Sequence, residues 1–158
     1  MSAVYKEIDL SYLESIADGD REIINELITI FLDQIPEFSE GLDQGLNNRD
    51  WRILAAIAHK AKSSVISMGM NTLGNIDLKN LELIAKSLRV NELQNKPALN
   101  EKEQEELGKT LHSLGSYPPE KQKWIRENSN EEIMRSIINS FKSKCDIACN
   151  ELRSVLVK

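Results

Sequence analysis

The sequence has little of what a β-sheet or a disulfide-rich fold requires. Its 158 residues include 7 glycines, 4 prolines and 2 cysteines, and aromatic residues make up only 5%. Runs of the β-branched and aromatic residues that favour strands are few. The composition therefore favours an all-α fold. A chain of this length is long enough to bury one core and short for two, so we expect a single domain over residues 1–158.

Two further absences bear on location and partners. No apolar run approaches the roughly 20 residues that span a bilayer, and the N-terminal MSAVYKEIDL lacks the apolar stretch of a secretory signal. The net charge of −5 argues against a nucleic-acid partner, because phosphate binding needs a concentrated cationic face. We therefore expect a soluble, cytoplasmic protein that binds neither nucleic acid nor a membrane.

The cysteines do not have the pattern of a metal site. Cys145 and Cys149 lie four residues apart with no histidine or further cysteine nearby, which is too few ligands for structural zinc. We interpret them as small core residues of one helix. The chain also shows neither a glycine-rich phosphate loop nor an acidic cluster that could hold magnesium. The sequence thus predicts no metal and no cofactor of its own.

Helical periodicity is the pattern that the sequence does have. Apolar residues recur at three- and four-residue steps in four long segments, about 20–46, 51–68, 71–87 and 131–157. A short helix from Asp9 to Ala17 is expected before them, with Asp18-Gly19 as its stop. Asp20 and Asp50 are the expected N-caps of the first two long helices.

Two details of these segments are specific enough to check. Pro36 lies inside the first long segment, where we expect it to bend the helix without ending it. In the third long segment, helical spacing predicts that the apolar residues share one face: Leu73, Ile76, Leu78, Leu81, Ile84 and Ala85.

Residues 89–130 interrupt the periodic pattern. They have a lower apolar density and contain Pro97, Pro118 and Pro119. Asn100 and Glu103 resemble a capping box, and three leucines after them predict one helix that ends at Gly115. The fold expected is therefore an antiparallel four-helix bundle with a short N-terminal helix and an insertion before the last helix. Its core would comprise about 8–88 and 131–157.

One histidine stands out on the second long segment. At about 100° per residue, His59 lies about 140° from Leu54, the centre of the apolar stripe, so it should face water. Its neighbours on that face are mostly small or apolar, although charged residues usually fill such faces. This surround indicates a docking surface that lets a partner come close. The neighbours are Ala55, Ala56, Lys62, Ser63 and Ile66.

The residue types around this histidine fit phosphoryl transfer. A neutral imidazole is a competent nucleophile near pH 7, and its free nitrogen can attack phosphorus. Lys62, one turn from His59, could neutralise the negative charge that spreads in such a reaction. The other histidine, His112, lies in the insertion without a comparable surround, and we interpret it as structural or incidental.

The segment also resembles a known motif. The run AHKAKSSV at 58–65, followed by Met68-Gly69 and Leu73, resembles the A-H-x-L-K-G-S-S motif of histidine-containing phosphotransfer (HPt) domains. Further matching positions lie on both sides, so the resemblance covers about residues 8–88. These positions are Phe31-Leu32, Pro36-Glu37, Leu42, Asp50-Trp51, Leu81-Glu82 and Ala85-Lys86. Two departures are Ser63, where the family most often has glycine, and Ala61, where it has leucine.

The resemblance implies a role in two-component phosphorelays. His59 would be the phosphoacceptor and Lys62 its phosphate contact, with Ser63 and Ser64 flanking the site. The phosphoryl group would come from an aspartyl-phosphate on the receiver domain of a hybrid histidine kinase or response regulator, and would pass to another receiver. The receiver would supply magnesium and the aspartate. The chain would then be a phosphocarrier without an ATP site and not an enzyme with its own turnover.

Three other functions fit an all-α chain. The first is an HPt-like module that binds a receiver or another helical partner without carrying phosphate; an intact His59 and Lys62 argue against it. The second is a metal- or ligand-binding bundle, which needs inward-facing glutamate and histidine sets that the sequence lacks. The third is a helical protein of the membrane surface, which the net negative charge disfavours.

Overall fold

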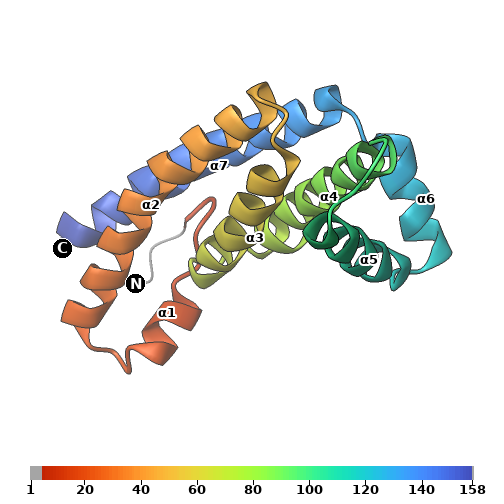
Figure 1. Ribbon diagram of the computed structural model, residues 1–158. Helices are drawn as coiled ribbons and strands as arrows, with labels where there is room; N and C mark the ends of the chain where they lie inside the picture. Colours follow the sequence, from red (N-terminus) through yellow and green to blue (C-terminus); the bar gives the residue numbers. More distant parts are fainter. Residues whose placement is uncertain (1–4, 158) are drawn as a thin grey trace.

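The computed structural model describes residues 5–157, and these form seven α-helices and one π-helical segment (Figure 1). This part of the chain contains no strand, which confirms the all-α prediction. The elements are α1 (Ser11–Ile16), α2 (Arg21–Asn47), α3 (Trp51–Ser67), η1 (Leu73–Leu78), α4 (Lys79–Gln94), α5 (Glu101–Gly115), α6 (Pro119–Asn128) and α7 (Glu131–Val157).

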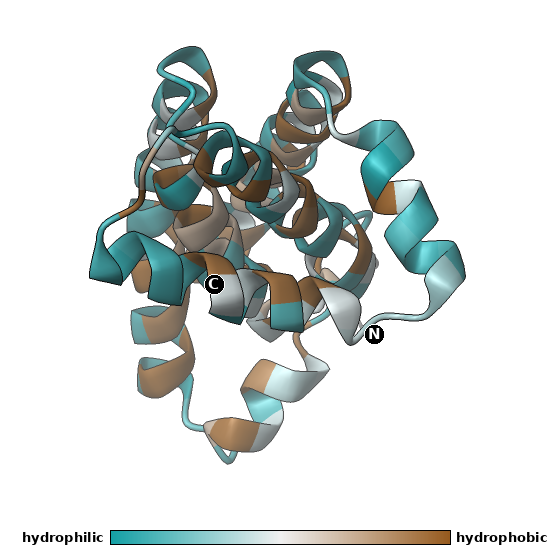
Figure 2. Ribbon diagram, turned by 45° about the vertical axis from the view of Figure 1, so that its right-hand side comes forward, coloured by the Kyte–Doolittle hydropathy of each residue, from teal (hydrophilic) through white to brown (hydrophobic). Residues whose placement is uncertain are grey.

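Helices α2, α3, α4 and α7 form an antiparallel bundle, as predicted. Helix α3 packs between α2 and α4, and α7 packs along α2 and also contacts η1 and α4. The antiparallel pairing of α2 and α7 is fixed at both ends. Arg21 donates to the carbonyl oxygen of Val155 at 2.6 Å, and Arg49 forms a 2.7 Å ion pair with Glu131. In Figure 2 hydrophobic and hydrophilic stretches alternate along the helices, as expected of amphipathic helices.

The helix starts and stops follow the local sequence signals. The Asp20 carboxylate accepts hydrogen bonds from two backbone amides at the start of α2, and Asp50 accepts one at the start of α3. Asp18 and Gly19 both have positive φ, which ends α1 in the expected turn. Helix α2 continues through Pro36. These three predicted boundaries therefore rest on side-chain capping at Asp20 and Asp50 and on a left-handed backbone turn at Asp18 and Gly19.

Helix α7 places both cysteines in the core. Cys145 and Cys149 are free thiols, and both lie buried with Phe141 and Leu152 on the face that packs against the bundle. Burial raises the pKa of both thiols, because the thiolate is poorly solvated there. The interpretation of these residues as core packing is confirmed. Among residues 5–157, no helix combines the length and the apolar character needed to cross a bilayer.

The predicted apolar face of the segment after α3 is wrong at one position. Ile76 is exposed, whereas Leu73 and Leu78 are buried. The reason is that residues 73–78 form a π-helix, in which residues five apart share a face. Three- and four-residue spacing therefore does not apply until α4 begins at Lys79.

The predicted insertion starts at the wrong residue, whereas its predicted end at residue 130 matches the start of α7 at Glu131. Helix α4 continues to Gln94 and buries Val90 and Leu93, so the boundary at residue 88 falls inside a helix. The Asn100–Glu103 capping box and the end of α5 at Gly115 are confirmed. Helix α6 was not predicted, because Ile125 is its one buried residue and leaves no periodic pattern. Both α5 and α6 pack on α4.

Neighbouring residues on α3 provide a test of how this helix faces the core. Leu54 is fully buried and Ile53 is half exposed. We expect Leu54→Ala to lower the free energy of unfolding by about 2–5 kcal/mol, because it leaves a cavity. Ile53→Ala should cost less than about 1 kcal/mol. Urea denaturation of both variants measures the difference, and equal losses would contradict this orientation.

Candidate functional site

His59 stands on the solvent side of α3, as its position on the helical wheel predicts. Its side chain is 65% exposed. The buried residues Ala58 and Ala61 lie on the other side of the helix, against the core. Ala61, at the position where the HPt motif has leucine, is fully buried. The imidazole is thus outside the core and open to a partner.

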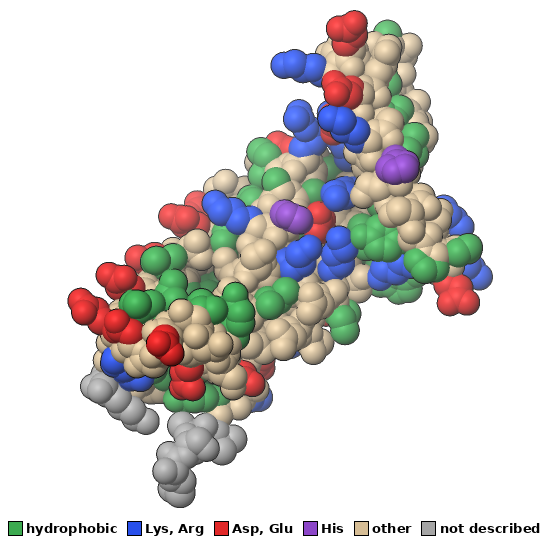
Figure 3. All heavy atoms as spheres, turned by 90° about the horizontal axis from the view of Figure 1, so that it is seen from below, with side chains coloured by type: hydrophobic (Ala, Val, Ile, Leu, Met, Phe, Trp, Pro, Cys, Tyr) green, Lys and Arg blue, Asp and Glu red, His purple; other side chains and the backbone are tan. Residues whose placement is uncertain are grey.

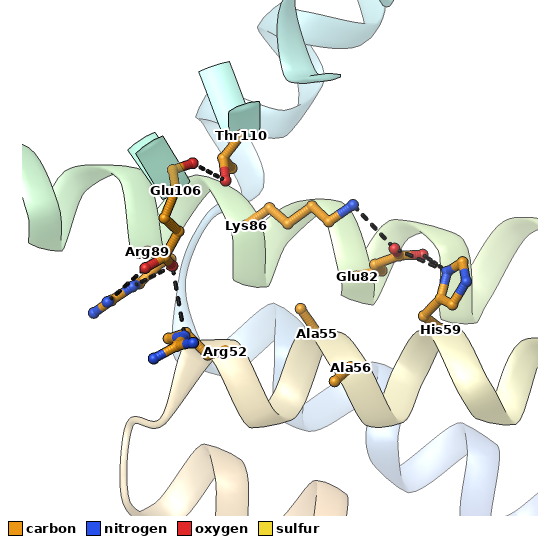
Figure 4. Close-up of a pocket in the computed structure, with 9 residues that line it drawn as sticks. All are labelled: Arg52, Ala55, Ala56, His59, Glu82, Lys86, Arg89, Glu106 and Thr110. Atoms are coloured by element: carbon orange, nitrogen blue, oxygen red, sulfur yellow. Dashed lines mark hydrogen bonds and ion pairs between the residues drawn. The ribbon is translucent and has the colours of Figure 1, made fainter. Parts of the chain in front are cut away.

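The imidazole is held by a carboxylate that the sequence reasoning did not single out. His59 Nδ1 lies 3.2 and 3.3 Å from the two carboxylate oxygens of Glu82 on α4 (Figure 4). The side chain of Glu82 is only 4% exposed. A buried carboxylate is unusual and needs partners of opposite charge. In the sequence Glu82 is marked only by the Leu81-Glu82 pair that resembles the HPt pattern, and this pair does not reveal its contact with His59.

Three lysines complete the surroundings of Glu82. Lys86 Nζ lies 3.1 Å from the carboxylate, and Lys62 and Lys79 lie 3.8 and 3.9 Å from it. Burial by itself raises the pKa of Glu82. This effect is outweighed by the hydrogen bond from Lys86 and by the charges of Lys86, Lys79 and His59, all of which lower the pKa. The net result is a lowered pKa, so the carboxylate is ionised at neutral pH.

An ionised Glu82 fixes how His59 uses its two nitrogens. A carboxylate can only accept hydrogen bonds, so Nδ1 must carry the hydrogen in the contact with Glu82. In the neutral ring, Nε2 then has the free lone pair. Within residues 5–157 no hydrogen bond involves Nε2. The geometry presents a nucleophilic nitrogen to solvent and holds the opposite nitrogen in place.

The charges around this ring suit a bound phosphoryl group. Lys62, Lys79 and Lys86 against Glu82 leave a net charge of about +2 beside the imidazole. A phosphoryl group carries about −1.5 to −2 at neutral pH. Its attachment at Nε2 would therefore offset most of the positive charge that the lysines leave at this site.

The predicted docking residues are placed unevenly around His59. Ala56 and Ser63 are exposed on the same face, whereas Ala55 is buried beneath it. Ala55 and Ala56 nevertheless both line the groove beside the imidazole. Their role in docking stays a prediction.

Ser64 and Ile66 face neighbouring elements more than solvent. The Ser64 hydroxyl donates to the side-chain oxygen of Gln34 on α2 at 3.1 Å. Ile66 was expected to be exposed but is half-buried, because it packs against Gly74 of η1. A Cβ on Gly74 would come within 2.5 Å of the Ile66 side chain and 3.0 Å of the Lys62 carbonyl oxygen. A glycine there lets η1 approach α3 directly beside the site.

An open groove of about 480 Å³ runs from His59 between α3, α4 and α5 (Figure 4). Helix α3 contributes the small floor residues Ala55 and Ala56, and α4 and α5 form the walls. The remaining lining residues are charged or polar, namely Arg52, Glu82, Lys86, Arg89, Glu106 and Thr110. The insertion therefore contributes part of the surroundings of His59.

The face that carries this site differs in charge from the rest of the molecule. Figure 3 shows a histidine surrounded by lysine and arginine side chains, with an acidic side chain beside it. Acidic side chains gather toward the end of this face nearest the grey residues. The chain as a whole has a net charge of −5. A local cationic surface on an acidic protein favours anionic groups at this point.

The second histidine has a different environment. His112 is exposed on α5, and within the described residues it forms no hydrogen bond or ion pair. It does not line the groove. This residue is therefore a matched control for His59.

A signal for Glu82 is present in the sequence. Lys79, Glu82 and Lys86 are spaced three and four residues apart, which places them on one face of a helix. That spacing predicts the ion pairs of Glu82 with Lys79 and Lys86. It does not reveal that the face packs against His59 and Lys62 of another helix.

Comparison with protein-family models, with curated proteins and with solved structures finds no match for this chain. Its function is therefore inferred from its own residues and geometry.

The buried carboxylate makes a pH-dependent contribution to stability. Because the folded-state pKa of Glu82 lies below its ordinary value of 4.5, the ionised group stabilises the fold above that pH. This contribution is lost as the pH falls through the lowered pKa. We expect Glu82→Gln to cost about 1–3 kcal/mol at pH 7 and progressively less below about pH 4.5.

Urea denaturation across this pH range measures the effect. Glu105→Gln is the matched control, because Glu105 is exposed and, within residues 5–157, pairs only with Lys109 one turn along α5. That variant should differ little from the parent at any pH. The ionised, paired state of Glu82 would be contradicted if the difference in free energy of unfolding between the parent and Glu82→Gln stayed constant down to acidic pH.

Proposed function

We propose that this protein is a histidine phosphocarrier of a phosphorelay. His59 accepts a phosphoryl group from an aspartyl-phosphate on a receiver domain and passes it to another receiver. The observation that carries the proposal is the orientation of the imidazole, with Nδ1 bonded to the buried Glu82 and Nε2 open to solvent. The resemblance of residues 58–65 to the HPt motif points to the same role.

The proposed transfer is a single displacement at phosphorus. The lone pair of Nε2 attacks the phosphorus, the bond from phosphorus to the aspartate oxygen breaks, and its electron pair returns to the aspartate carboxylate. The ring keeps its Nδ1 hydrogen and becomes positively charged as the new bond forms. The Glu82 carboxylate, 3.2 Å from Nδ1, stabilises this charge. Transfer to the next receiver reverses the same step.

The lysines act on the negative charge of the transferred group. Lys62 is the proposed phosphate contact; it lies on the same helix as His59, and its Nζ is 3.8 Å from the Glu82 carboxylate. Lys79 and Lys86 supply further positive charge at the same carboxylate. A lysine can turn from Glu82 toward a phosphoryl oxygen, because its ammonium is a mobile point charge with three donors.

The proposal assigns the remaining chemistry to the partner. The receiver brings the aspartate and the magnesium ion, and this chain contributes His59 with its charged surroundings. Among the described residues, no group of three or more metal-ligating side chains is found. A cytoplasmic location is part of the proposal, because the receiver domains that the resemblance implies as partners are cytoplasmic.

A binding module without phosphoryl transfer is the second candidate. It is favoured by large apolar side chains that stay exposed on α1 and α2, among them Tyr12, Ile16, Ile23 and Ile30. Such a surface suits a protein partner. The two functions differ in whether phosphorus becomes bonded to His59.

Labelling from a phosphorylated receiver separates these functions. We expect acid-labile label on the wild-type protein and none on His59→Gln, because glutamine lacks a nucleophilic nitrogen. His112→Gln should keep the label, since His112 lies outside the site. Label that persists in His59→Gln would remove the main proposal, and complex formation without label would favour the binding module.

The role of Glu82 can be tested by rate. We expect Glu82→Gln to slow labelling by about 10- to 100-fold, the usual effect of losing the partner that orients a functional histidine. Glu105→Gln should label at the wild-type rate. Rapid-quench measurement at saturating receiver concentration isolates the chemical step, and an unchanged rate would show that Glu82 serves only the fold.

A further inference from the structure

The insertion reaches the His59 face through a charged contact from α5. Glu106 accepts hydrogen bonds from Arg89 of α4 at 2.7 and 2.9 Å, and it lies 3.7 Å from Arg52 of α3. Thr110, one turn farther along α5, also lines the groove. These contacts join α5 to both helices of the site. The wall of the groove beside His59 is therefore held in a fixed position.

A second contact comes from the turn before α6. The Nζ of Lys79 lies 5.7 Å from the ring centroid of Tyr117. The pKa of Lys79 is raised, mainly by hydrogen bonding to the Tyr117 side chain. Lys121 of α6 donates to the Asn80 side chain at 2.5 Å. The insertion thus contacts Lys79, one of the three lysines around Glu82, and the neighbouring residue Asn80.

The two arginines of the groove differ in availability. Arg89 is 13% exposed and is paired with both Glu92 and Glu106. Arg52 is 68% exposed, and its one ion pair with another described residue is the loose 3.7 Å contact with Glu106. Arg89 therefore serves to fasten α5 onto α4. Arg52 remains free to bind an anionic group from outside.

Geometry places a partner over this groove. His59 is itself a lining residue of the groove, so a protein that brings an aspartyl-phosphate to Nε2 must also lie above the adjoining lining residues. The small floor at Ala55 and Ala56 leaves depth for a loop. The exposed cation above that floor is complementary to acidic side chains.

We propose that this groove is a second contact site for the receiver, where an acidic loop of that partner binds Arg52 beside the wall formed by α5. This inference rests on the proposed function, and it deepens it by naming the residues that select the partner. The insertion then decides which receivers approach His59 productively. Specificity arises because receivers with a basic or bulky loop at this position are disfavoured.

The test compares two phosphoryl donors of different size. Phosphorylated receivers dock on the protein, whereas phosphoramidate, a small donor, transfers its phosphoryl group to Nε2 with release of ammonia and needs no groove. For receivers that label the wild type, we expect Arg52→Glu to slow phosphoryl transfer about tenfold. The transfer rate of this variant should also depend less on salt concentration. Labelling by phosphoramidate should not change.

Two further variants make the result specific. Arg52→Lys should restore much of the receiver rate, because it returns the positive charge. Lys123→Glu, at an exposed residue of α6 outside the groove, should leave the rate unchanged.

Several outcomes would overturn the groove assignment. These are a wild-type receiver rate in Arg52→Glu, an equal loss with both donors, or an equal loss in Lys123→Glu. Inhibition of transfer by inorganic pyrophosphate in the wild type but not in Arg52→Glu would assign the groove to a small anion instead. Failure of phosphoramidate and receivers alike to label wild-type His59 would remove the proposed function itself, which is a different result from any of these.

Discussion

The arrangement of the site depends on one buried carboxylate, Glu82. Removing a carboxylate from water costs several kcal/mol unless opposite charges and hydrogen bonds replace the lost solvation. His59 and Lys62 supply them from α3, and Lys79 and Lys86 supply them from α4. The same contacts that make the burial tolerable also orient the imidazole and gather three cations within one patch. Stability and the proposed chemistry therefore rest on the same side chain.

This carboxylate can take its place only because α3 and α4 approach closely. Gly74 leaves room for Ile66 and for the backbone at Lys62, and the π-helical segment that contains it turns Leu73 and Leu78 inward. Helix α4 then begins with Lys79 already at the carboxylate. The irregular segment sets the register of α4 against α3, so a change there would move the charges as well as the core.

The sequence predicts the features that depend on local chemistry and not those that depend on register between helices. Asp20 and Asp50 cap the helices as expected, and the wheel places His59 outward. Contact between His59 and Glu82 joins residues 23 positions apart, and no periodicity within one helix contains that information. Ile76 was misplaced for a related reason, since spacing assumes an α-helix where the chain forms a π-helix.

The surroundings of His59 are chemically asymmetric, and this constrains any partner. On one side the insertion raises a wall that carries Glu106 and keeps Arg52 at its edge. Away from it, α1 and the first half of α2 expose large apolar side chains, and Figure 3 shows hydrophobic groups gathered toward that end of the same face. A partner that covers the imidazole would meet a cationic groove on one side and a surface of mixed apolar and acidic side chains toward the other end. The surface of that partner would need acidic groups opposite the groove and apolar groups opposite the far end. Such an arrangement would fix the orientation in which an aspartyl-phosphate reaches Nε2.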